Sequence, residues 1–160
     1  MDSLFQTKLN MFAVAFYKGT SSGLMGLYDI LARWWTRSSF SHCEMIFSDG
    51  VSASSSFIDG GVRFKRIEYN PDHWEIIELP TEFESEAREW FSKHEGQPYD
   101  LIGNLGFVLG PVKDSKGNWF CSEAVLASLG VEEPFKFSPS TAMPVIKSIA
   151  KTWSILSSST

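Results

Sequence analysis

The sequence predicts an α+β protein in which a small antiparallel sheet packs against helices. The middle of the chain contains strand-length segments at 42–48, 51–57, 62–67 and 74–79, each bounded by turn-forming residues. Before and after this region, apolar residues recur at helical spacing. A chain of 160 residues with 43% hydrophobic content suits one domain, spanning 1–160, with a single core.

The N-terminal part is expected to supply one strand and one helix. Residues 11–16 form a short, almost unbroken apolar run, which is typical of a buried strand. A serine at position 21 or 22 can then cap a helix. The apolar residues of that helix repeat at helical spacing, at Leu24, Leu27, Leu31 and Trp34.

The four middle segments are expected to form an antiparallel meander. The sequences between them are rich in turn formers: Asp49-Gly50, Asp59-Gly60-Gly61 and Asn70-Pro71-Asp72. Side chains alternate between the two faces of a strand. His42, Glu44 and Ile46 should therefore share one face of the first segment, and Cys43 should lie on the other, in the core.

Three helices are expected after the strands. Thr81 and Glu84 have the spacing of a capping box, and the helix that follows should end at Gly96. A glycine-rich loop at 103–117 precedes a helix over 120–129, which Gly130 ends. A short amphipathic helix follows, through Val145, Ile146, Ile149 and Trp153.

Composition narrows the function classes. The net charge is −5, and the basic stretch Arg63, Lys65 and Arg66 is too small for a nucleic-acid footprint. The first residues do not resemble a signal peptide, and no apolar run approaches the ~20 residues of a membrane span. We therefore expect a soluble protein without stable membrane insertion. No spacing of histidines, cysteines or carboxylates indicates a metal, and no cofactor is expected.

Cys121 is the candidate nucleophile. It falls in the first turn of the helix predicted at 120–129, where unpaired backbone N–H groups favour a thiolate. His42 opens a strand after a polar run and is the candidate base, whereas His73 and His94 fit surface or helix-end positions. A buried, inert Cys121 is the alternative interpretation.

A third group is expected to orient the imidazole by accepting its other ring N–H. Glu44 lies on the same strand, and the serines of 51–56 lie on the next one. A two-residue hairpin loop at Asp49-Gly50 would bring Ser55 to the face of His42, and a shift of one residue would bring Ser54 and Ser56 there instead. The sequence leaves this register open.

Four short blocks occur in order along the chain: Ser41-His-Cys-Glu44, Asp59-Gly-Gly-Val-Arg63, Gly96-Gln-Pro-Tyr-Asp100 and Phe120-Cys-Ser-Glu123. Together they resemble the circularly permuted NlpC/P60 papain-like proteins, in particular a phage-encoded branch described as distant relatives of cell-wall-associated hydrolases. As in that permuted group, the histidine precedes the cysteine. The resemblance spans about residues 38 to 129.

The resemblance implies a permuted papain-like fold, with catalytic Cys121 on a helix packed against the sheet that carries His42. The third catalytic position then falls near Ser54, where many relatives have glutamate, and Glu44 can compensate. The resemblance also implies that the Tyr99 hydroxyl contributes to an oxyanion hole.

The leading functional prediction is a cysteine hydrolase that cleaves an amide or peptide bond, with a peptide-like substrate such as a peptidoglycan peptide. A lipid amidase or acyltransferase acting on an acylated substrate through the same Cys-His pair is the first alternative. The second is a catalytically weak phage binding or inhibitory protein on the same scaffold. The expected place of action is the host cytoplasm or the virion.

Overall fold

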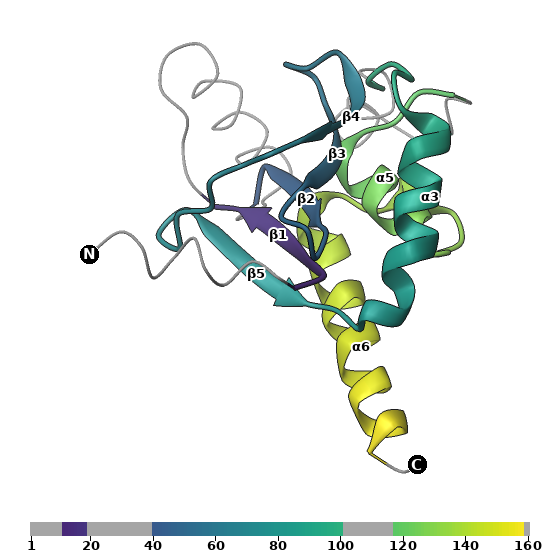
Figure 1. The fold of residues 1–160 in the computed structure, drawn as a ribbon. Coiled ribbons are helices and arrows are strands. Elements are labelled where there is room, and N and C mark those ends of the chain that lie inside the picture. Colours follow the sequence, from purple (N-terminus) through teal and green to yellow (C-terminus); the bar gives the residue numbers. More distant parts are fainter. Residues whose placement is uncertain (1–10, 19–39, 101–116, 159–160) are drawn as a thin grey trace.

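A five-stranded antiparallel sheet forms the centre of the protein (Figure 1). The computed structural model describes residues 11–18, 40–100 and 117–158. The strand order is β4-β3-β2-β1-β5. The strands are β1 (Ala13–Tyr17), β2 (His42–Ile46), β3 (Ser52–Ser56), β4 (Gly61–Lys65) and β5 (Trp74–Glu78).

Helices cover one face of this sheet. In Figure 1, α3 and α5 lie beside β2, β3 and β4, and α6 runs along the end of the sheet near β1 and β5. The predicted α+β class is therefore confirmed. The bounds of these helices are α3 (Glu84–His94), α5 (Cys121–Ser128) and α6 (Pro139–Ser157).

The predicted meander is correct for β2, β3 and β4 but wrong for β5. That strand pairs with β1 across the sheet, with Tyr17 opposite Trp74. The side chains explain the choice, because the Trp74 ring lies 4.9 Å from the rings of both Tyr17 and Tyr69. Turn signals mark where strands end, but they do not specify which edge the next strand joins.

The core lies between the sheet and the helices. Cys43, Met45 and Phe47 point into it, as strand alternation predicts, and they pack with buried residues of the helices such as Phe91 and Leu126. Ile46 lies on the other face, in a small separate cluster with Ala13 and Ala15. The two faces of β2 thus have different surroundings.

The β2–β3 hairpin has a three-residue loop, residues 48–50, instead of the two-residue alternative. The Phe47 amide donates to the Val51 carbonyl at 2.8 Å, and Gly50 adopts a left-handed φ of 77°. Met45 consequently pairs with Ala53 and Ile46 with Ser52. This register puts Ser54 and Ser56, rather than Ser55, on the face of His42.

Two helix starts differ from the sequence predictions. Thr81 begins a 3-10 turn, and no side chain caps α3. Glu84 accepts the Ser48 amide and hydroxyl instead, both at 2.8 Å, so the capping-box prediction was wrong. Helix α6 begins earlier than predicted, because Ser138 caps it and Pro139 suits its first turn.

The ends of α3 and α5 agree with the predictions, since Gly96 and Gly130 have left-handed φ values of 81° and 73°. The helix predicted through Leu24 and Trp34 lies outside the described residues, as does the loop at 103–116. Within the described ranges, no helix has the length and apolar character needed to cross a membrane.

Gly61, the first residue of β4, lies against the backbone of the segment that leads toward Cys121. A Cβ at this position would lie 2.0 Å from the Gln97 carbonyl oxygen, and the neighbouring Val62 amide donates to that same oxygen at 2.9 Å. Gly61 has φ of 147°, a conformation that L side chains rarely adopt. This close backbone approach requires glycine.

We expect Gly61→Ala to lower the free energy of unfolding by more than about 2 kcal/mol, because strain and a backbone clash add together. Gly60→Ala is the matched control: Gly60 also has a positive φ of 83°, but nothing lies within 4 Å of a Cβ there. It should cost only about 1 kcal/mol. Urea unfolding measures both, and equal losses would contradict the close-approach argument.

Candidate active site

Hydrogen bonds from two other segments hold the backbone just before Cys121. The Ser55 hydroxyl donates to the Trp119 carbonyl at 2.6 Å. Trp119 also donates to the Pro98 carbonyl and accepts the Asp100 amide, both at 3.0 Å. Because Ser55 belongs to β3 and residues 98–100 are tied to β4, the start of α5 is fixed against the sheet.

Cys121 is the first residue of α5 and is only 4% exposed. A hydrogen bond from the Cys43 thiol lowers the pKa of Cys121 well below its ordinary value, and the charge and hydrogen bond of His42 act in the same direction against the opposing effect of burial. Burial and the charge of Cys121 raise the pKa of Cys43. Only Cys121 is therefore predisposed to be a thiolate.

His42 connects Cys121 to a buried carboxylate. Its Nε2 lies 2.6 Å from Oε1 of Glu44, a residue that is 1% exposed. Burial tends to lower the pKa of His42, but the negative charges of Cys121 and Glu44 outweigh it and raise the pKa to about 10. An imidazolium between two anions is the charge state that this arrangement favours.

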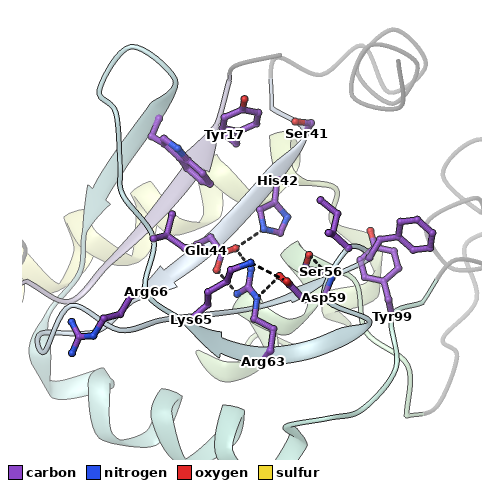
Figure 2. A pocket seen from close by; sticks show the side chains of 14 residues that line it. Tyr17, Ser41, His42, Glu44, Ser56, Asp59, Arg63, Lys65, Arg66 and Tyr99 are labelled. Atoms are coloured by element: carbon purple, nitrogen blue, oxygen red, sulfur yellow. Dashed lines mark hydrogen bonds and ion pairs between the residues drawn. The ribbon is translucent and has the colours of Figure 1, made fainter. Parts of the chain in front are cut away.

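Arg63 keeps Glu44 ionised. Its guanidinium binds both carboxylate oxygens, with Nη1 2.7 Å from Oε2 and Nη2 2.5 Å from Oε1 (Figure 2). Burial alone would raise the pKa of Glu44, but the Arg63 hydrogen bonds and the His42 charge hold it below the usual range. A buried carboxylate needs such partners, because an unpaired one is strongly destabilising.

Asp59 extends the row of charges. It accepts Nε of Arg63 and Nζ of Lys65, each at 2.9 Å, and these partners hold its pKa at about 2 despite partial burial. Figure 2 shows the resulting line from His42 through Glu44 and Arg63 to Asp59 across β2 and β4. Positive and negative groups alternate along it.

Glu44 and Ser54, the two candidates for the third catalytic position that the resemblance raised, make different contacts. Glu44 accepts the imidazole N–H, whereas the Ser54 hydroxyl donates to the Cys43 carbonyl at 2.7 Å. Ser54 shares the face of His42, but within the described residues no hydrogen bond links it to the imidazole. Of these two candidates, Glu44 is the one that contacts the imidazole.

Tyr99 lies at the same end of the sheet as His42, and both line one pocket. It forms a bridge with Trp119, two residues before the cysteine, and its ring lies 5.9 Å from Phe57. Glu123 accepts the Phe120 amide at 3.3 Å, so it supports the start of α5.

Sequence reasoning missed Arg63 and Asp59 as parts of the site, and it considered Ser55 only as a neighbour of His42, whereas Ser55 holds the Trp119 carbonyl. Arg63 and Asp59 lie within one of the blocks that carry the resemblance, and alternation along β4 puts Arg63 and Lys65 on one face, so a signal was present. What it did not give was their partner, because Glu44 is 19 residues away in the chain. Within the described residues, no group of three or more His, Cys, Asp or Glu could hold a metal ion.

No family model, curated protein or solved structure matches this chain. The interpretation of the site therefore rests on its own geometry and electrostatics.

Glu44→Gln should raise the pKa of Cys121 by about one unit or more, because a neutral amide no longer stabilises the imidazolium that stabilises the thiolate. Ser54→Ala should leave that pKa unchanged and cost about 1 kcal/mol of stability, through the lost bond to the Cys43 carbonyl. The rate of Cys121 alkylation against pH measures the Cys121 pKa in both variants, and urea unfolding measures the stability of Ser54→Ala. A larger pKa shift in Ser54→Ala than in Glu44→Gln would reverse the assignment.

Proposed function

We propose that this protein is a cysteine hydrolase that cleaves an amide or peptide bond, with Cys121 as nucleophile, His42 as acid and base, and Glu44 as the orienting group. The observation that carries the proposal is the position of His42. It links a thiol of lowered pKa to a buried, ionised carboxylate 2.6 Å away. This is the arrangement of nucleophile, base and third group that activates a cysteine.

The proposed reaction begins with attack of the Cys121 thiolate on the substrate carbonyl carbon. A C–S bond forms, the carbonyl π electrons move to oxygen, and the oxyanion is stabilised by backbone N–H groups at the start of α5 together with the Tyr99 hydroxyl. Because Nε2 of His42 faces Glu44, Nδ1 is the nitrogen available to the thiol and the leaving group.

Collapse of this intermediate breaks the C–N bond, and the His42 imidazolium gives its proton to the departing amine. The neutral imidazole then takes a proton from water, which attacks the thioester carbonyl. The C–S bond breaks, the acid product leaves, and the Cys121 thiolate and His42 imidazolium are restored. No external oxidant or reductant is needed.

The proposal includes a circularly permuted papain-like fold, to which the order of His42 and Cys121 and the helix packed against the sheet lend support. A peptidoglycan peptide is the substrate that the resemblance suggests, and this suggestion rests on analogy of fold. An unreactive Cys121 would instead favour the catalytically weak binding protein.

The first test is the pH dependence of Cys121 alkylation by iodoacetamide, in the wild type and in His42→Ala. Cys43 is kept, because its hydrogen bond contributes to the low pKa of Cys121, and peptide mapping by mass spectrometry separates the two thiols. In the wild type, alkylation should rise through a pKa below the ~8.5 of a free thiol, and change again near pH 10 as His42 loses its proton.

In His42→Ala, the lower step should move up to about 8.5 or beyond, which lowers the rate at pH 6.5 by about tenfold or more. His73→Ala is the matched control, since His73 is an exposed histidine in the turn before β5 and its ring contacts Tyr17. An alkylation profile that is the same in the wild type and in His42→Ala would contradict the catalytic assignment.

A second test looks for the covalent intermediate. Mixing the wild type with p-nitrophenyl acetate should give a rapid burst of about one p-nitrophenolate per chain, followed by slow turnover, because acylation outpaces deacylation. Intact mass and peptide mapping should put the acetyl group on Cys121. A burst of the same size in Cys121→Ala would show that another residue reacts.

A further inference from the structure

A pocket of about 380 Å³ opens over the sheet face that carries His42 and Glu44, opposite the helices. The row of charges described above forms part of its lining, together with Tyr99 and the turn between β3 and β4 (Figure 2). Cys121 is not among the described lining residues. Because His42 lines the pocket and Cys121 does not, the pocket is placed to hold a part of the substrate that lies beside the reacting bond.

One side of this pocket is apolar and exposed. Phe57 and Ile58, at the β3–β4 turn, are 49% and 72% exposed, and Tyr99 packs against Phe57. Single exposed apolar residues are ordinary on protein surfaces. Two adjacent ones that line a pocket beside a reactive histidine are better explained as contacts for an apolar ligand.

The same pocket carries an excess of positive charge. Its basic residues are His42, Arg63, Lys65 and Arg66, and its only carboxylates among the described residues are Glu44 and Asp59. Both carboxylates already accept hydrogen bonds from these cations, and Lys65 is still 53% exposed. A positive pocket in a chain of net charge −5 favours an anionic ligand.

From these two features we infer that the pocket selects an amide flanked by an apolar group and a carboxylate, as in an N-acyl amino acid. The apolar group of the substrate lies on Phe57 and Ile58, and its carboxylate lies near Lys65 and Arg63. This substrate class deepens the proposed function, on which it rests, and it excludes neutral and cationic amides as preferred ligands.

Binding to the Cys121→Ala protein tests the inference without turnover, by isothermal titration calorimetry with three matched amides. N-decanoylglycine has both groups, N-decanoylglycinamide lacks only the carboxylate, and N-acetylglycine lacks only the long apolar chain. N-decanoylglycine should bind about tenfold or more tightly than either of the others. Its advantage over the glycinamide should shrink as salt is added.

Two variants connect this binding to the pocket. Ile58→Ser and Lys65→Gln should each weaken N-decanoylglycine binding by about fivefold or more. Ile155→Ser and Lys93→Gln are matched controls, since these residues are 57% and 67% exposed and lie on α6 and α3, outside the pocket lining. All four sites are exposed, so the fold should be retained.

Equal affinities for the three amides, or equal losses in pocket and control variants, would overturn the substrate class. The alkylation profile separates this failure from failure of the proposed function. A low-pKa Cys121 without selective binding would leave the hydrolase and reject the substrate class. Selective binding with an ordinary thiol would support the ligand preference and reject the hydrolase.

Discussion

The buried carboxylate of Glu44 is the constraint on which the site depends. It lies in β2 at 1% exposure, and its charge is compensated by His42 on one side and by the fork of Arg63 on the other. Removing either partner would leave charge in a region of low dielectric, at a cost of several kcal/mol. The pairing of β4 with β3 puts Arg63 opposite Ser54, where it can bind Glu44. The strand register therefore affects the charge state of His42, through the carboxylate that contacts it.

Local patterns predicted which face each residue of β2 uses, and they could not predict what it meets there. Strand alternation separates Cys43 from His42 and Glu44 whatever the rest of the chain does. The partner of Glu44 depends on the length of the 48–50 loop, because one residue more or less exchanges the faces of β3. The sequence left these alternatives open, and the hydrogen bond from the Phe47 amide to the Val51 carbonyl shows that the three-residue loop is the one that forms.

The wrong predictions have a common physical cause. Thr81 and Glu84 fit a capping box locally, yet Glu84 finds better donors in Ser48, which is 36 residues away. Strand β5 follows β4 in the chain, yet it pairs with β1, where Trp74 packs against Tyr17. In both cases a tertiary contact outweighs a short-range signal. The same reasoning explains why the Arg63–Glu44 pair escaped prediction even though both residues lie in blocks that carry the resemblance.

The two cysteines show how one strand serves both faces of the sheet. Cys43 points into the core, and burial raises its pKa, which favours the thiol. Its neighbour His42 supplies positive charge that lowers the pKa of Cys121. The carboxylate of Glu44, on the face of the pocket, in turn raises the pKa of His42. Cys121, on the helix side of the sheet, is thus coupled through His42 to a charged pocket on the other side. Ligands in that pocket that alter the charge around Glu44 should therefore also alter the reactivity of Cys121.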